Sequence, residues 1–499
     1  MHQGAGQEVR APRWDDWKDA GRAALTVLGL LVVAGIVLRI VATTAWWPIV
    51  SNLADSYPYA SYAERDPFAD PQHPGGYSLF LALIGLVTRD IAVYGILQTV
   101  MGVLSGLLLF DGVRRMCGSP WPGVAGAAMV LLGADQVFLE RSIMSEAFLA
   151  FTLCATVYAT GRAMEMPDRW YPWPIVAAVF AAFGGMVKPH GLILLPLIAL
   201  ALILAKPRPW LPRWRPVVAF AAPVCVLMLA FATANSISHG NFGIGPTPGW
   251  HLYARVGPIA DCPQFEPPAG TEALCEETPF HEREGLNFYL YDEESPAVKQ
   301  FGAINTPSGL AADDKLGEFA KEVVVHEPRA YAEAVWRDVK GYYFPNDWAG
   351  ATGSGTSLDG QLQWNQKWDP GPDRFTEAGM EEFFDPFRIE RDMGTLDVLT
   401  DYQRVFRLGA TLLSICTILI ALGLLLGSRR QRLSVLVLGI GGLAMFVLPT
   451  FGAIYAGRYT VPMAGLIVAA AAVGAMSLWE WIRGMRARRS SPGTPRPAA

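Results

Sequence analysis

The sequence predicts an all-α polytopic membrane protein with about ten transmembrane helices and a mixed extracytoplasmic domain inserted between spans seven and eight. Hydrophobic residues make up 52% of the 499 residues and charged residues only 17%. This composition is too apolar for a water-soluble fold. The apolar residues gather in runs that approach the ~20 residues a helix needs to cross a bilayer. Continuous Leu, Val, Ala and Gly runs of this kind are typical of helices.

Basic residues mark the loops that are expected to face the cytoplasm. Arg114 and Arg115 follow the second expected span, Arg429 and Arg430 follow the eighth, and the other even-numbered loops are similarly basic. Because cytoplasmic loops are enriched in Lys and Arg, both termini are predicted to be cytoplasmic. The expected spans lie near residues 24–45, 91–113, 121–138, 146–163, 172–187, 191–205, 217–235, 404–426, 433–451 and 459–479.

This topology divides the chain into a membrane core and one large external insertion. The first apolar run is long enough to remain as an anchor, so we expect no cleaved signal peptide. The C-terminal tail is small and proline-rich and is expected to be disordered. The predicted parts are a cytoplasmic N-terminal segment, 1–23; seven spans in 24–235 with a first external loop at 46–90; an extracytoplasmic domain, 236–403; three spans in 404–482; and a cytoplasmic tail, 483–499.

The external insertion contains two features that predict structure. Cys262 and Cys275 are the only two cysteines outside apolar sequence, and in an oxidising compartment we expect them to form a disulfide, with two free thiols as the alternative. Residues 313–343 have helical periodicity interrupted at Pro328. They therefore predict two helices, the second leading toward the membrane.

Ionisable residues collect at one membrane surface in this topology. They are costly near the bilayer, so their positions are the best indication of a functional site. They comprise Asp55 and His73 in the first external loop, Glu140, Arg141 and Glu146 in the second, Lys188 and His190 between spans five and six, and Arg458 before span ten.

Five short stretches around these residues carry a resemblance to a known superfamily. They are LADSYPYA with Asp55, HPGGYSLFLALIG, ERSIMSEAFLAF, KPHGLILLP and GRYTVPM. In them the chain resembles the GT-C-fold, polyprenyl-phosphate-sugar-dependent glycosyltransferases. That group includes the protein O-mannosyltransferases, the aminoarabinose transferases and the mycobacterial mannosyl- and arabinofuranosyltransferases. The stretches lie between residues 53 and 463, and the large external loop carries no detailed likeness.

The resemblance implies roles for the ionisable residues. Polyprenyl phosphate is a competent leaving group, so the main need is a base for the acceptor hydroxyl, which we assign to Asp55. Lys188, His190 and Arg458 are expected to bind the donor phosphate, because cations stabilise its developing charge best in a water-poor site. The alternatives are a solvated or helix-capping carboxylate for Asp55 and basic side chains that reach toward lipid headgroups.

Other polar residues are expected to orient the substrates. Glu140 and Glu146 are six apart and share one helical face only if a turn intervenes. Either is expected to orient Arg141, the acceptor or a divalent metal, and His73 is expected to assist at the mouth of the site. No dense hard-ligand motif decides metal use, so a divalent metal is possible and no cofactor is required by the sequence.

The predicted function is therefore that of an inverting glycosyltransferase on the extracytoplasmic face of the cytoplasmic membrane. Its expected partners are a polyprenyl phosphate sugar donor, the lipid bilayer and a glycan, glycolipid or protein acceptor, with no nucleic acid. A transporter or flippase of a lipid-linked glycan is the main alternative, although transporters place binding groups near the midplane. A polysaccharide polymerase or ligase and a noncatalytic scaffold are further alternatives.

Overall fold

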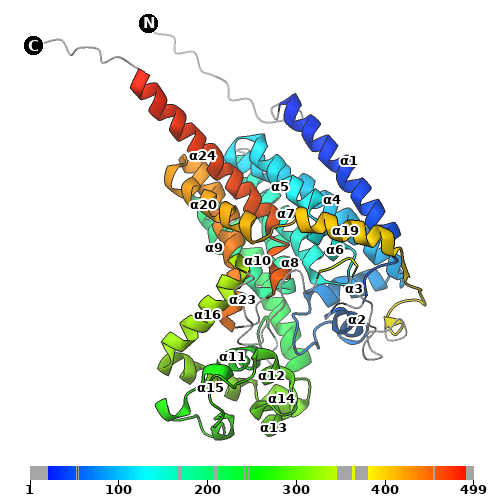
Figure 1. Cartoon of the computed structure of the whole chain (residues 1–499), viewed down its shortest axis with the longest axis vertical. Helices are drawn as coiled ribbons and strands as arrows, with labels where there is room; N and C mark the ends of the chain where they lie inside the picture. Colours follow the sequence, from blue (N-terminus) through cyan, green and yellow to red (C-terminus); the bar gives the residue numbers. More distant parts are fainter. Residues whose placement is uncertain are drawn as a thin grey trace, which may run out of the picture.

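The computed structural model describes most of the chain, and its regular secondary structure is almost entirely helical (Figure 1). The predicted N-terminal segment lies outside the described residues except for 21–23, and the predicted tail lies outside them except for 483–490. The described residues are 21–51, 53, 55–165, 171–205, 212, 214–240, 242–245, 247–344, 362–365, 380–452 and 456–490.

Long apolar helices form the core of the molecule, as the composition predicts. Among the described residues, seven stretches are long and apolar enough to cross a membrane, or eight if the bent pair α5 (Pro120–Leu132) and α6 (Ala134–Glu140) is one span. The seven are Arg22–Ala45, Ile91–Cys117, Ser145–Glu165, Trp214–Ser238, Met393–Leu426, Arg429–Gly452 and Ala464–Arg486.

These stretches correspond to helices or to successive helices of the chain. The single helices are α1 (Arg22–Ala45), α4 (Ile91–Cys117), α7 (Ser145–Glu165), α10 (Trp214–His239) and α24 (Ala464–Ser490). Two stretches consist of several elements. Met393–Leu426 contains α19 (Met393–Val405) and α20 (Ala410–Leu426). Arg429–Gly452 contains α21 (Arg429–Val435), the π-helical turn η7 (Leu436–Ile440), α22 (Gly441–Val447) and α23 (Pro449–Gly452).

Two expected spans are shorter than a bilayer crossing. α8 (Pro172–Val187) has 16 residues, and η2 (Pro189–Ile193) with α9 (Leu194–Leu204) fills the next segment. α8 ends before Lys188 because a following proline disfavours helical geometry in the residue that precedes it. The total of ten spans therefore stays a prediction.

The helices pack around α4, which contacts α5 and α7. α24 lies against α5 and α20, while α8 lies between α7 and α10. Two short helices, α2 (Ser56–Arg65) and α3 (Gly76–Gly85), follow α1 at one end of this bundle (Figure 1). At the same end β1 (Trp46–Trp47) pairs antiparallel with β2 (Glu390–Arg391), and Trp46 lies opposite Arg391. The pairing ties the end of α1 to the start of α19.

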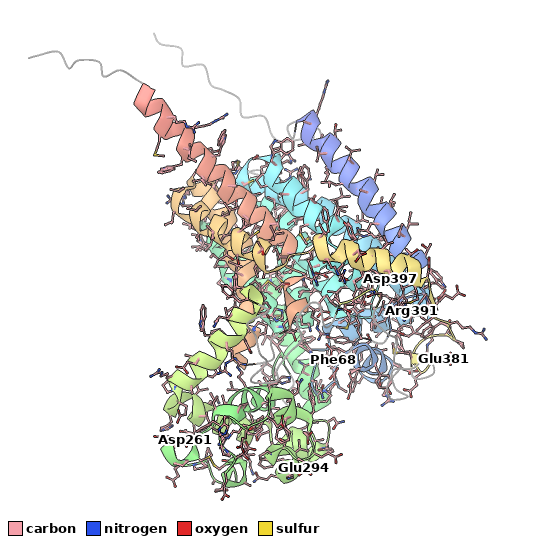
Figure 2. The ribbon with its side chains drawn as sticks, viewed as in Figure 1. Phe68, Asp261, Glu294, Glu381, Arg391 and Asp397 are labelled. Atoms are coloured by element: carbon pink, nitrogen blue, oxygen red, sulfur yellow. A yellow bond between two sulfur atoms is a disulfide. The ribbon has the colours of Figure 1, made fainter. Side chains whose placement is uncertain are left out.

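The insertion has a hydrophobic core of its own. Trp250, Tyr253, Leu316 and Phe319 are fully buried in it, and Asp261 and Glu294 mark its end farthest from the bundle (Figure 2). Its elements are α11 (Pro248–Val256), η3 (Gly257–Ile259), η4 (Cys262–Gln264), η5 (Glu272–Leu274), α12 (Leu286–Tyr291), α13 (Pro296–Phe301), α14 (Pro307–Ala311), α15 (Asp313–His326) and α16 (Pro328–Tyr343).

Two features of the insertion agree with the sequence. Cys262 and Cys275 form a disulfide with a Cα–Cα distance of 5.8 Å. α15 and α16 are the two helices predicted on either side of the break at Pro328. α16 leads to the bundle, where the Tyr342 ring lies 4.6 Å from the Phe446 ring of α22. This helix thus connects the insertion to the apolar core.

Candidate active site

Five of the predicted site residues meet in one chain of ion pairs, which we call the ion-pair cluster (Asp55, His73, Glu146, Lys188 and Arg458). Arg458 donates a 2.5 Å hydrogen bond to Oδ2 of Asp55, and Nε2 of His73 lies 3.6 Å from Oδ1 of the same carboxylate. Glu146 lies 3.4 Å from Arg458 and 3.9 Å from Lys188. The contacts thus alternate between cations and carboxylates.

Asp55 stands directly before α2 and faces the cluster instead of its own helix. It occupies the N-cap position of α2, but its side chain makes no capping hydrogen bond. An N-cap aspartate ordinarily accepts from backbone N–H groups of the first turn. Here both carboxylate oxygens are turned toward Arg458 and His73 instead. The side chain is 16% exposed, which leaves it within reach of a substrate.

The histidine is positioned by the turn that carries the HPGG sequence. Asp70 accepts backbone hydrogen bonds from Gln72 and His73, and its other oxygen lies 2.9 Å from Nδ1 of His73. After the turn, Gly76 approaches the backbone of Met186 so closely that a Cβ would lie 2.5 Å from its carbonyl. Only glycine permits such a backbone approach. The approach brings the histidine turn next to the end of α8.

Lys188 and Arg458 both lie where apolar helices break. Lys188 is extended between α8 and η2, in front of Pro189. Arg458 lies in the single turn η8 (Gly457–Thr460), ahead of α24. Glu146, in the first turn of α7 and 1% exposed, faces both cations. A proline or a short turn therefore places each cation at the end of the bundle rather than inside a span.

The electrostatics of the cluster favour the charged form of every group whose pKa departs from its ordinary value. Burial opposes ionisation of Asp55, but Arg458 and His73 outweigh it and hold the pKa of that carboxyl well below its usual range. Burial likewise opposes protonation of His73, but Asp70 and Asp55 raise its pKa well above 6.5. The carboxylates and the Tyr59 and Tyr459 side chains also raise the pKa of Lys188 and of Arg458 against burial.

Aromatic side chains line the cluster, and sequence reasoning assigned them no role. Lys188 lies 5.3 Å from the centre of the Tyr459 ring, in cation–π range. His190, predicted to bind phosphate, lies beside the same ring at 6.0 Å and reaches the edge of the cluster only. The Tyr59 ring is tilted against the His73 ring, with ring centres 5.0 Å apart, and its hydroxyl shares a hydrogen bond with Ser145. Tyrosines are also common in loops at the membrane interface, so the presence of these residues in the sequence did not indicate that they line a site.

Glu140 and Arg141 do not join the ion-pair cluster, and their role in orienting substrate stays a prediction. Glu140 is fully buried and accepts two 2.7 Å hydrogen bonds from Arg39 of α1. Arg141 donates to the carbonyl of Pro48. The end of α6 and the turn before α7 separate the two glutamates, so Glu140 faces α1 while Glu146 faces Lys188 and Arg458. The feature of the sequence that indicates this pair is Arg39, because an arginine inside an expected span requires a buried acidic partner.

The described residues contain no group of three or more His, Cys, Asp and Glu side chains that could hold a metal ion.

Two residues of the insertion lie close to the cluster. Tyr291 at the end of α12 is half exposed, reaches Gln72 of the histidine turn at 3.5 Å, and has its pKa raised to about 12, mainly by burial. Burial and the charge on His73 lower the pKa of His251.

A comparison with known protein families identifies one segment of the chain. Residues 72–234 match the family model described as dolichyl-phosphate-mannose-protein mannosyltransferase. The segment contains His73, Glu146 and Lys188 but neither Asp55 nor Arg458. No curated protein matches the chain.

Solved structures similar to the chain include the oligosaccharyltransferase of Archaeoglobus fulgidus in three forms. The apo form has 12% sequence identity and a TM-score of 0.40, with 97% of this chain and 54% of that chain covered. The form tethered to an acceptor peptide has 14% identity and a TM-score of 0.43, with 97% and 52% covered. The complex with an inhibitory peptide and a dolichol-phosphate has 13% identity and a TM-score of 0.38, with 98% and 53% covered.

The chain spans about half the length of these solved structures. The family match covers the histidine turn, the start of α7 and the Lys188 junction, which are three of the places where the sequence resembles GT-C enzymes. Over residues 72–234 the chain thus carries the sequence pattern of the dolichyl-phosphate-mannose-protein mannosyltransferase family, and its resemblance to the GT-C glycosyltransferases is confirmed.

Proposed function

We propose that the protein is an inverting glycosyltransferase that moves a sugar from a polyprenyl phosphate donor to an acceptor hydroxyl. The contact between Asp55 and Arg458 carries this proposal. It joins an ionised carboxylate to a cation at the point where the bundle meets the insertion. A base and a phosphate-binding group side by side are what displacement at a sugar phosphate requires.

The donor phosphate is proposed to bind between Arg458 and Lys188. Both side chains are protonated, and Glu146 holds them on one side of the site. A guanidinium is the preferred partner of phosphate oxygens because its planar donors match their geometry. A phosphate at this position competes with Asp55 for Arg458. The carboxylate is thereby released from its ion pair, and its pKa rises toward that of a useful base.

The transfer step follows from this arrangement. The acceptor oxygen attacks the anomeric carbon while Asp55 takes the hydroxyl proton. The bond between the anomeric carbon and the phosphate oxygen breaks, and its electron pair leaves with the phosphate, whose charge Lys188 and Arg458 stabilise. A single displacement inverts the anomeric centre. His73 is proposed to hold Asp55 in position from the side opposite Arg458.

The setting of the reaction is part of the proposal. The site is proposed to face the extracytoplasmic side of the cytoplasmic membrane, with both termini in the cytoplasm and residues 236–403 as an external domain. The match to mannosyltransferases favours a hexose as the sugar, and a glycan, glycolipid or protein hydroxyl as the acceptor. The insertion, through Tyr291 and His251, is proposed to lie on the acceptor side of Asp55.

Sugar transfer by the purified protein tests the proposal directly. The full chain is reconstituted in lipid vesicles with radiolabelled polyprenyl phosphate sugars, mannosyl, arabinofuranosyl and glucosyl donors being tried in turn. Asp55→Asn is expected to lower kcat by about 10²- to 10⁴-fold, the usual contribution of a general base. Glu64→Gln is the matched control, because Glu64 lies in the neighbouring α2 and pairs with Arg89.

The outcomes separate the alternatives. Unchanged transfer by a folded Asp55→Asn variant would remove Asp55 as the base. No transfer from any donor, combined with movement of a labelled lipid-linked glycan across the vesicle membrane, would favour a flippase.

A further inference from the structure

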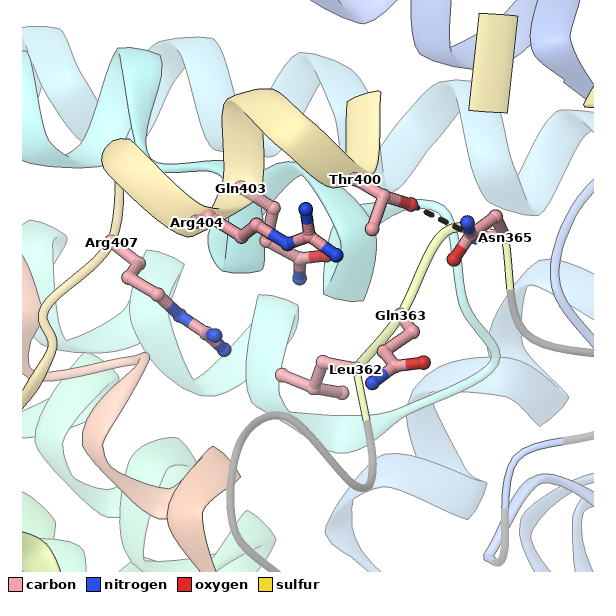
Figure 3. Close-up of a pocket in the computed structure, with 7 residues that line it drawn as sticks. All are labelled: Leu362, Gln363, Asn365, Thr400, Gln403, Arg404 and Arg407. Atoms are coloured by element: carbon pink, nitrogen blue, oxygen red, sulfur yellow. Dashed lines mark hydrogen bonds between the residues drawn. The ribbon is translucent and has the colours of Figure 1, made fainter. Parts of the chain in front are cut away.

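A second polar pocket lies apart from the ion-pair cluster, between α19 and the short segment 362–365 (Figure 3). Its volume is about 380 Å³, within the range of small-molecule sites. Gln363 and Leu362 form one wall, and Gln403 and Arg404 of α19 face them across the pocket (Figure 3). The lining is mainly polar, and Leu362 is its one aliphatic side chain among the described residues.

The wall formed by residues 362–365 is fixed in place. Trp364 is fully buried and packs edge-on against Phe138 of α6, with ring centres 4.9 Å apart. The Asn365 backbone N–H donates to the Thr400 hydroxyl, and its side chain donates to Asp397 at 2.7 Å. The segment is therefore held to both α6 and α19, and the polar side chains beside Trp364 have a rigid support.

The opposite wall is tied to the first turn of α6. Gln403 donates a 2.6 Å hydrogen bond to Asp135, and Arg407 contacts both oxygens of that carboxylate at 3.1 Å. Arg404 donates to Asp401 at 2.8 Å on the surface of α19. Two elements far apart in the sequence thus meet at one set of donors and acceptors.

The charge around the pocket indicates the class of ligand. The two guanidinium groups of the lining each pair with a carboxylate outside it, Arg404 with Asp401 and Arg407 with Asp135. These ion pairs offset the positive charge that a phosphate or sulfate would need. A neutral polyol needs no such charge, and its hydroxyl groups both donate and accept, as do the carboxamides and the hydroxyl that face the pocket.

We propose that this pocket binds a neutral saccharide unit. The site is distinct from the ion-pair cluster because α6 separates Asp135 from the turn that leads to Glu146, and seven helical residues rise about 10 Å. The inference goes beyond sugar transfer at Asp55 and does not depend on it.

Binding of simple glycosides tests the inference. The full chain is placed in lipid nanodiscs without glycoside detergents, whose sugar headgroups would compete. Saturation-transfer NMR then measures binding of methyl α-mannopyranoside, methyl β-galactopyranoside and an α-linked mannotriose, with inorganic sulfate as the anionic comparison. Gln363→Ala and Arg404→Ala change exposed side chains of the pocket. Arg329→Ala is the control, since Arg329 makes a comparable surface pair with Glu333 on α16.

At least one glycoside is expected to bind, and each pocket variant is expected to weaken it about tenfold, the effect of losing one good hydrogen bond. Arg329→Ala and Asp55→Asn should bind it as the wild type does. Binding that is lost in Asp55→Asn but kept in both pocket variants would place the sugar at the ion-pair cluster and overturn the inference. Binding of sulfate alone, or of no glycoside, would overturn it as well. Glycoside binding by a protein that transfers no sugar would refute the proposed function and leave this site standing.

Discussion

The Asp55 carboxylate accepts a hydrogen bond from Arg458, although the two residues are 403 positions apart in the chain. The same guanidinium lies 3.4 Å from Glu146. One arginine thus connects the proposed base to the residue that orients the second cation. Substitutions at Arg458 are therefore the most direct probe of the donor site.

Arg458→Lys is expected to raise the KM for the polyprenyl phosphate donor about tenfold. Lysine keeps the charge but loses the planar donors that contact Asp55 and Glu146 together. Steady-state kinetics with varied donor measures the change, and Arg429→Lys, an exposed arginine of α21, is the control. A donor KM equal to that of the wild type would exclude Arg458 from donor binding.

His73 is expected to stabilise the fold below neutral pH. Its pKa is raised in the folded state, so its contribution to the free energy of unfolding is fully present below 6.5 and is lost as the pH rises through the folded pKa. The melting temperature of the wild type minus that of His73→Gln should therefore be largest near pH 6 and shrink in alkali. His281→Gln, at an exposed position, is the comparison. A difference that grows with pH would show that His73 is neutral in the fold.

Gly76→Ala is expected to abolish most transfer. The added Cβ would lie 2.5 Å from the carbonyl of Met186, so the histidine turn must move away from the end of α8. Overpacking of this kind also costs about 1–3 kcal/mol of stability. Gly29→Ala in α1 is the matched control, because no atom lies within 4 Å of the place that its added methyl group would occupy. Transfer assays and melting curves of the two variants are compared, and equal activity would refute the tight approach.

Glu140→Gln is expected to lower the free energy of unfolding by about 3–5 kcal/mol, because it leaves Arg39 buried without its ionic partner. The double variant Arg39→Leu/Glu140→Leu should recover much of that loss, since apolar residues need no partner. Thermal unfolding in detergent measures both. If Glu140→Gln unfolds like the wild type yet loses transfer, Glu140 acts on the substrate after all.

Removal of the disulfide is expected to loosen the insertion alone. The Cys262→Ser/Cys275→Ser variant loses a cross-link that closes a 13-residue separation, worth about 2–4 kcal/mol. Limited proteolysis should then cut near residues 262–275, while cleavage of the bundle stays unchanged. Cys225→Ser, at an exposed free cysteine, is the control. Faster cleavage throughout the protein would show that the insertion also stabilises the bundle.

The sequence predicted the helices well because their signals are local. Apolar runs identified every long helix of the bundle, and Pro328 marked the break between α15 and α16. The short strands β1 and β2 were not predicted, because two residues are too few to show an alternating pattern. The expected span 172–187 has the bounds of α8, whereas the expected span 191–205 begins with the 3-10 turn η2, because hydropathy does not register the turn at Pro189.

The site was predicted in part for a related reason. Asp55, Lys188 and Arg458 could be found because charges beside apolar runs are rare. Their pairing, and the different pairing of Glu140 with Arg39, depends on which helix faces cross in space. Tyr59 and Tyr459 carried no signal, since tyrosines are common at membrane interfaces whether or not they contact a site.

The break before α24 gives the site a fixed order of assembly during synthesis. Four residues of the ion-pair cluster lie in the first 190 residues and are synthesised early, namely Asp55, His73, Glu146 and Lys188. Arg458 is synthesised only after the insertion and several further helices. Domains and segments are made from the N-terminus onward. Until η8 reaches the bundle, Asp55 lacks its guanidinium partner, so a partly synthesised chain has the proposed base but only half of the cations for the donor. Under the proposed function, the arrival of Arg458 at the bundle is therefore the step that completes the set of cations for the donor phosphate.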